Sequence, residues 1–249
     1  MDDSTTSPSF GMFDISDSFE LNLPNNAIRL TKISENVFSY ARKDSSGNIT
    51  EKIIPSDKDT LRIEFAPIDA LNHPAKRTNY MYLDFETPVF LSESAAAKIF
   101  VQCPIEMGIF IVNGSKKDSL DWFSCEPEKS RFGLYGSPDS GILCKYYKSH
   151  VVNSYDEHES FVNTVMQLNL QNQLGSGHSI NKVVFPINEN KLYYKDNHCK
   201  YDSLNAVLKK KLTVEVLDVE IQTIETDWTE APPFEFSIPY KRIDMDVVQ

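Results

Sequence analysis

The sequence lacks the short motifs that mark the commonest enzyme classes. Its nine glycines stand singly or in turns, and none follows the Rossmann or Walker spacing, so nucleotide binding by those routes is excluded. There is no Gly-x-Ser-x-Gly elbow, no His-Glu-x-x-His helix and no Cys-x-x-Cys pair, which removes the usual signatures of hydrolases, metalloproteases and zinc ribbons. We therefore expect no cofactor, no metal centre and no catalytic residue of these standard kinds.

Long apolar runs are also missing. No window approaches the roughly 18 consecutive apolar residues that a membrane helix needs. The first residues, MDDSTTSPSF, have neither the basic nor the hydrophobic region of a signal peptide. We expect a cytoplasmic protein that does not insert into a membrane.

Cysteine and basic residues are scarce. The four cysteines lie far apart in a chain of 249 residues, which is long enough to fold without disulfides, so we expect reduced thiols. They are Cys103, Cys125, Cys144 and Cys199. The 25 Lys and Arg residues are outnumbered by 36 Asp and Glu residues, giving a net charge of −11. That charge opposes binding to nucleic acid or an anionic membrane, so we expect a partner, if there is one, to be a protein.

What the sequence does contain is a stretch from Thr78 to Val112 dominated by apolar and β-branched residues. Met81, Leu83 and Phe85 alternate with Tyr82 and Asp84, which places the three apolar side chains on one face of a strand. Residues 98–103 and 105–112 predict two further strands, and Pro104 should break the chain between them because proline cannot donate to a ladder. This stretch predicts the core of an all-β domain.

The rest of the chain predicts two β-sandwich-like antiparallel domains. Residues 1–9 are expected to be a flexible tail, residues 10–152 an N-terminal β domain, and residues 153–249 a C-terminal domain. The polar passage from Ser149 to Ser160 is the best candidate for the linker between the domains. The segment from Asp202 to Lys211 predicts one short helix, with Leu204, Val207 and Leu208 on one face.

Three passages carry a resemblance to a known family. They are TNYMYLDFETPVFL (residues 78–91), CPIEMGIFIV (residues 103–112) and RFGLYGSPDSGILCKYYKSHV (residues 131–151). In these blocks the chain resembles an archaeal family known as domain of unknown function 432, with similarity from about Phe10 to the end. The resemblance implies an archaeal, cytoplasmic origin. It implies no activity and no catalytic residue.

Two clusters contain side chains that could bind a metal ion. Asp156, Glu157, His158 and Glu159 are consecutive, and neighbours in an extended chain point to opposite sides, so a solvated linker is the favoured interpretation. His198 and Cys199 would still need ligands from elsewhere in the chain.

Glu106 is the one charged residue in an otherwise apolar strand. A carboxylate there must be paired or lie at an edge, since an unpaired buried charge is costly. The structural hypothesis is an ion pair with Arg131, Lys145 or Lys148. The functional hypothesis is an acid with a shifted pKa in a cleft.

Aromatic residues gather in two neighbouring strand segments: Trp122, Phe123, Phe132, Tyr135, Tyr146 and Tyr147. Aligned on one exposed sheet face they would form a platform for sugars or for a partner's side chains, and otherwise they fill the core. Tyr146 and Tyr147 must point to opposite faces of a strand, so at least one of them should face outward.

Two functional hypotheses remain. The first is a non-enzymatic binding or scaffold protein that acts through a sheet face or the groove between domains; the absence of motifs favours it. The alternative is a ligand-binding or hydrolase-like enzyme with a site at the domain junction. The candidate surface residues are Glu106, Trp122, Arg131, Tyr135, Lys145, Tyr146 and Tyr147.

Overall fold

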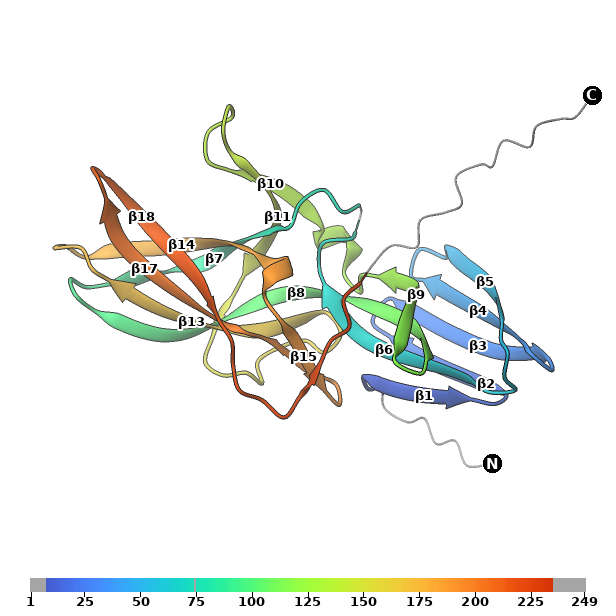
Figure 1. Ribbon diagram of the computed structural model, residues 1–249. Helices are drawn as coiled ribbons and strands as arrows, with labels where there is room; N and C mark the ends of the chain where they lie inside the picture. The colour runs from blue at the N-terminus through green and yellow to red at the C-terminus, as the bar shows by residue number, and fades with distance from the viewer. Residues whose placement is uncertain (1–7, 74, 235–249) are drawn as a thin grey trace, which may run out of the picture.

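The computed structural model describes residues 8–73 and 75–234, and confirms an all-β protein (Figure 1). Residues 1–7 of the expected tail lie outside the described part, whereas Phe10 packs against the rings of Phe65 and Phe161. Within residues 8–73 and 75–234 the only helical segments are two short 3-10 turns, η1 (Pro127–Lys129) and η2 (Ile187–Glu189). None of the described segments is a helix long and apolar enough to cross a membrane.

The strands form three sheets. The largest contains β1 (Gly11–Ile15), β6 (Leu61–Asp69), β8 (Ala96–Asn113), β9 (Lys116–Phe123), β12 (Val151–Val152), β13 (Asn163–Asn172), β15 (Leu192–Lys195), β16 (His198–Tyr201), β17 (Ser203–Lys211), β18 (Val214–Gln222) and β19 (Thr229–Glu230). The second contains β2 (Ser18–Leu23), β3 (Asn26–Ser34), β4 (Val37–Asp44) and β5 (Ile49–Pro55). The third has the order β10 (Arg131–Tyr135), β11 (Ile142–Ser149), β7 (Tyr80–Leu91), β14 (His178–Pro186).

Strand β8 is the axis of the fold. Its first half, up to Pro104, pairs with β13, and its second half, from Ile105, pairs with β6. The expected break at Pro104 was wrong, because one strand runs through it. Pro104 stands where β8 changes its partner from β13 to β6. Proline is tolerated at this position because the N–H donor that it lacks does not interrupt either ladder of hydrogen bonds.

The other strands gather at the two ends of β8 (Figure 1). The sheet β2–β5 lies beside β6 and β9, while β7, β13, β14, β17 and β18 lie around the other end. The division of the chain at residues 152 and 153 stays a prediction. Two pairings, β7 with β14 and β8 with β13, join segments from either side of that position. Buried apolar residues from both groups form one cluster, and the four cysteines are free and buried.

The predicted helix from Asp202 to Lys211 was wrong. Residues Ser203–Lys211 form β17, which runs parallel to β13 and antiparallel to β18. Leu204 and Ala206 are fully buried at alternate positions, so burial between two neighbouring strands overrode the local helical pattern. Most pairings are antiparallel as expected, but β11–β7, β13–β16 and β13–β17 are parallel.

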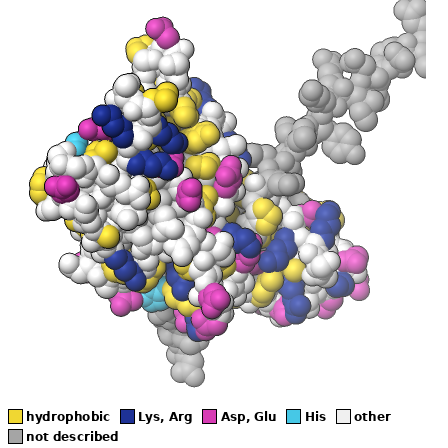
Figure 2. Space-filling model, turned by 60° about the vertical axis from the view of Figure 1, so that its left-hand side comes forward, with side chains coloured by type: hydrophobic (Ala, Val, Ile, Leu, Met, Phe, Trp, Pro, Cys, Tyr) yellow, Lys and Arg dark blue, Asp and Glu magenta, His cyan; other side chains and the backbone are white. Residues whose placement is uncertain are grey.

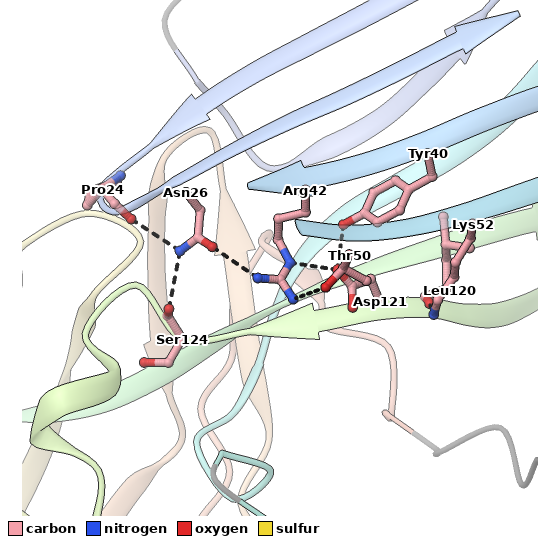
Figure 3. A network of polar contacts seen from close by, with 9 residues as sticks. All are labelled: Pro24, Asn26, Tyr40, Arg42, Thr50, Lys52, Leu120, Asp121 and Ser124. Atoms are coloured by element: carbon pink, nitrogen blue, oxygen red, sulfur yellow. Dashed lines mark hydrogen bonds and ion pairs between the residues drawn. The ribbon is translucent and has the colours of Figure 1, made fainter. Parts of the chain in front are cut away.

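A buried polar network ties the sheet β2–β5 to β9 (Figure 3). Asp121 Oδ2 accepts hydrogen bonds from the Tyr40 hydroxyl at 2.6 Å and from Arg42 Nε at 2.7 Å. Arg42 also donates to Asn26 and Thr50, both at 3.3 Å. The Arg42–Asp121 ion pair is largely buried, and the Arg42 guanidinium donates to several acceptors. The pair therefore holds the sheet β2–β5 in a fixed position against β9.

Candidate functional site

Three tyrosines meet on the outer face of the sheet β10–β11–β7–β14. Register places Arg131 of β10 opposite Tyr146 of β11, and Tyr146 beside Tyr82 of β7. The rings of Tyr82 and Tyr146 lie 5.4 Å apart between centroids, and those of Tyr82 and Tyr135 lie 6.1 Å apart. With Lys182 of β14 these residues form what we call the tyrosine patch: Tyr82, Tyr135, Tyr146, Arg131 and Lys182.

Strand alternation produces this face. In β7, Met81 and Leu83 are fully buried, so Tyr82 between them points outward. In β11, Tyr147 is only 7% exposed, so its neighbour Tyr146 points to the opposite, outer face and joins the patch. Gly133 lies beside Tyr146; a Cβ built on it would be 3.4 Å from the ring, which is an ordinary van der Waals contact.

Two cations lie over the rings of the patch. The Arg131 guanidinium is 5.4 Å from the centroid of Tyr146, and Lys182 Nζ is 6.0 Å from Tyr82 and 5.9 Å from Tyr135. Within residues 8–73 and 75–234 neither cation has a carboxylate oxygen within 4 Å. Both cations therefore contact ring faces without a direct ion pair.

The carboxylate of Asp84, beside Tyr146, is already engaged. Asp84 Oδ2 accepts a hydrogen bond of 2.7 Å from the Tyr146 hydroxyl, and this bond is the largest cause that raises the pKa of Tyr146. Burial raises the pKa of Tyr82, with Asp84 as a further cause. Both tyrosines are therefore neutral hydroxyls at physiological pH, and Asp84 fixes the orientation of Tyr146.

The β10–β11 hairpin carries apolar side chains into solvent beside the patch. Leu134, Ile142 and Leu143 are 51%, 40% and 42% exposed. Figure 2 shows a protrusion at the top of the molecule, with hydrophobic side chains running down from it beside a group of lysines and arginines. An apolar surface adjoining cations is typical of a protein contact rather than of a solvated face.

Glu106 lies elsewhere, in a buried polar cluster. It is 2% exposed, and its carboxylate accepts the backbone N–H of Asn72 at 3.1 Å and of His73 at 2.9 Å. The predicted ion pair between Glu106 and a basic residue of the 131–148 hairpin was wrong. Within the described residues no basic side chain lies within 4 Å of the Glu106 carboxylate. Lys145 instead donates to the His73 carbonyl and to Ser130 Oγ.

Burial governs the titration of this cluster. It raises the pKa of Glu106 to about 7, against the lowering effect of the His73 N–H and the nearby Lys145 charge. It also lowers the pKa of Lys145, against the raising effect of Glu106. Both groups are thereby shifted towards their neutral forms.

The structure brings four of the predicted residues together at one small cavity. Glu106, Lys145, Tyr146 and Tyr147 all line it, and its volume is about 30 Å³. Because a buried water needs roughly 10–15 Å³, the cavity has room for about two waters. Arg131 and Tyr135 do not line it.

Trp122 is separate from both places. It lines an open cleft of about 290 Å³ with His73 and Arg42, and its ring lies 6.2 Å from that of His73 in an edge-on arrangement. Of the residues in the two predicted metal clusters, the structure brings His158 and His198 together, with ring centroids 4.9 Å apart. In the described part of the chain no three His, Cys, Asp or Glu residues are grouped to hold a metal ion.

Sequence reasoning missed two residues of the tyrosine patch. Tyr82 could have been found, because its place between Met81 and Leu83 already put it on the outer face. Lys182 carried no such signal, since only the pairing of β14 with β7 brings it opposite Asp84 and near Tyr82.

Comparison with known proteins identifies the family but no function. No curated protein and no solved structure matches the chain. The model of the family described as "Protein of unknown function (DUF432)" matches residues 9–233, which is most of the chain. The chain therefore belongs to the DUF432 family.

Proposed function

We propose that the chain is a binding module that engages a partner protein through the tyrosine patch. The observation that carries the proposal is the convergence, on one exposed sheet face, of three tyrosines and two cations without a carboxylate partner among the described residues. Tyrosine and arginine are the side chains most often found at the energetic centre of protein interfaces. Exposed apolar residues of the adjoining hairpin extend the same surface.

Charge indicates the kind of partner. Arg131 and Lys182 would pair with carboxylates, so the partner surface should be acidic where it meets the patch. The net charge of −11 makes the rest of this protein repel such a surface, which confines binding to the patch. A cytoplasmic, archaeal setting and a lack of nucleic-acid binding belong to the same proposal.

Affinity capture from cells of the source organism tests it with matched variants. Tyr146→Ala and Arg131→Glu should lose a protein that wild type retains, because they remove one ring and reverse one charge of the patch. Ile53→Ala and Lys43→Glu, on exposed positions of β5 and β4, are the controls and should retain it. Equal retention by all four variants would contradict the proposal.

A hydrolase is the second candidate, and one observation favours it. Lys145 Nζ donates to Ser130 Oγ, whose own hydroxyl donates to the His73 carbonyl at 2.6 Å, and burial lowers the pKa of Lys145; once neutral, the amine could turn to accept the Ser130 proton and activate that hydroxyl as a nucleophile. A fluorophosphonate probe distinguishes the candidates. Labelling of wild type that Ser130→Ala abolishes would favour the hydrolase over the binding module.

A further inference from the structure

Two histidine rings meet at one end of the largest sheet. His158 belongs to the segment that precedes β13, and His198 is the first residue of β16. The two strands run parallel, with Val165 opposite Lys200, so the chain before β13 lies beside the start of β16. The ring centroids are 4.9 Å apart, and the ring planes are inclined at 66° to each other.

Hydrogen bonds hold the segment before β13 in place. The side-chain oxygen of Asn163 accepts from the backbone N–H of Glu159 at 3.0 Å, and the N–H groups of Val162 and Asn163 both donate to the Glu159 carbonyl at 3.0 Å. Asn197 Nδ2 donates to Ser160 Oγ at 3.3 Å, which ties the segment to the residue before β16. The backbone on both sides of the histidine contact is therefore fixed.

The hydrogen bond of His158 determines which of its ring nitrogens can bind a ligand. Nδ1 lies 3.0 Å from the carbonyl oxygen of Tyr155, and a carbonyl can only accept, so Nδ1 carries the proton. In the neutral ring Nε2 then presents a lone pair. Nε2 is buried and has no hydrogen-bond partner within residues 8–73 and 75–234. Metal-binding histidines share this arrangement, because a carbonyl bound at one nitrogen orients the other towards the ion.

Burial favours the neutral form of His158, which is the form that binds metals. It lowers the pKa of His158, and the charge of His198 acts in the same direction. The hydrogen bond to Tyr155 and the charge of Asp156 oppose these effects and raise the pKa. The carboxylate of Asp156 therefore lies near the His158 ring, where it favours the approach of a cation.

The spacing of the two rings matches that of imidazoles bound to one ion. A histidine nitrogen lies about 1.1 Å from its ring centroid and about 2.0 Å from a bound Zn²⁺, which puts the ion about 3 Å from each centroid. With a tetrahedral angle at the ion, the two centroids are then about 5 Å apart. The observed separation is 4.9 Å.

The protein supplies two ligands at this place. Cys199 follows His198 in β16, so its side chain points to the opposite face of the strand, and it is buried there. As stated above, no three His, Cys, Asp or Glu side chains are grouped to hold an ion in the described part of the chain. Two imidazoles with waters in the remaining positions suit Zn²⁺, Ni²⁺ or Cu²⁺, whereas Mg²⁺ and Ca²⁺ prefer oxygen ligands.

We propose that His158 and His198 together bind one borderline divalent cation such as Zn²⁺. The bound ion holds the 153–162 segment against β16, because each of its two protein ligands comes from one of these segments. This inference goes beyond the proposed function and does not rest on it, since neither histidine belongs to the tyrosine patch.

Isothermal titration of the full chain, without an affinity tag and with Zn²⁺ as the probe, tests the site. One Zn²⁺ should bind per chain, and an excess of Mg²⁺ should not compete with it. His158→Ala and His198→Ala should each weaken binding by at least about tenfold, because one imidazole remains. His150→Ala and His178→Ala remove histidines elsewhere in the fold and should stay within about twofold of wild type.

Proteolysis gives a second measurement. Glu157 and Glu159 are exposed in the segment that the ion holds, so Zn²⁺ should slow their cleavage by a glutamate-specific protease in wild type. Zn²⁺ should leave the cleavage rate of His198→Ala unchanged, and this variant also controls for an effect of Zn²⁺ on the protease. Both histidines are only partly buried, so each variant should fold, and circular dichroism checks this.

Three results would overturn the proposal. The first is that no Zn²⁺ binds, in which case a water is the donor to His158 Nε2. The second is that His158→Ala or His198→Ala binds Zn²⁺ as tightly as wild type does. The third is that the control variants His150→Ala and His178→Ala lose as much affinity as these two.

Discussion

The His73 backbone N–H donates a hydrogen bond of 2.9 Å to Glu106 Oε1, so a loop residue satisfies a carboxylate buried in the central strand. The same residue's carbonyl accepts from the Lys145 ammonium. Glu106 and Lys145 therefore both bind the backbone of His73, on successive peptide units, and act on each other through space without a direct ion pair. The cluster fixes the 70–73 segment against β8 and β11.

Removing the carboxylate should destabilise the fold. Glu106→Ala leaves the buried N–H groups of Asn72 and His73 without their acceptor and Lys145 without its nearest opposing charge, so we expect a loss of about 3–5 kcal/mol in the free energy of unfolding. Glu106→Gln keeps one oxygen acceptor and should cost about 1–2 kcal/mol. Urea denaturation at pH 7 measures both. Glu35→Ala, at an exposed position, is the control, and a Glu106→Ala loss as small as the control's would contradict the prediction.

Stability should fall as pH rises from about 4 to 7. Burial raises the pKa values of Glu106 and Asp69 to about 7, above their values in the unfolded chain, so the folded state binds more protons in this window. The stabilisation is complete below the unfolded pKa values and is lost as pH rises through the folded ones. Each group contributes up to about 1.4 kcal/mol per pH unit. Denaturation at several pH values measures this. The free energy of unfolding should depend less on pH in the double variant Glu106→Gln/Asp69→Asn than in wild type. The same pH dependence in both proteins would refute the assignment to Glu106 and Asp69.

The Asp121 network should be worth more than a surface ion pair. Asp121→Ala leaves Arg42 buried without its carboxylate, so we expect a loss of about 3–5 kcal/mol, and Tyr40→Phe should cost about 1–2 kcal/mol. Asp118→Ala, which removes an exposed pair with Lys116 on the same strand, should stay within about 1 kcal/mol. Chemical denaturation ranks the three, and equal losses at Asp118 and Asp121 would show that burial adds nothing.

Cleavage in the segment between β12 and β13 tests the predicted two-domain division. Glu157 and Glu159 are exposed there, so a glutamate-specific protease should cut this segment before it cuts β8. Because β7–β14 and β8–β13 join strands from both fragments, the nicked chain should elute as one species in gel filtration without denaturant. Fragments that separate under those conditions would show two independent domains.

Local patterns in the sequence account for much of the fold and part of the tyrosine patch. Alternation put Met81 and Leu83 inside and made Tyr146 and Tyr147 face opposite ways, because successive side chains of any strand alternate whatever its partners are. Tyr135, Tyr146 and Arg131 were accordingly among the candidates. The patch itself needed the parallel pairing of β11 with β7, which joins residues about 64 positions apart, as Tyr146↔Tyr82 shows.

Nonlocal pairing explains what the sequence pattern did not reveal. Lys182 joins the patch only through the register of β14 on β7, and Glu106 finds its donors in a loop that no spacing connects to it. Residues 203–211 carry a helical pattern but lie between β13 and β18, where strand pairing on both sides and burial of Leu204 and Ala206 outweigh a local preference of a few tenths of a kcal/mol per residue. Side-chain alternation is a property of one strand, whereas neighbours, register and the satisfaction of a buried charge exist only once the chain has folded.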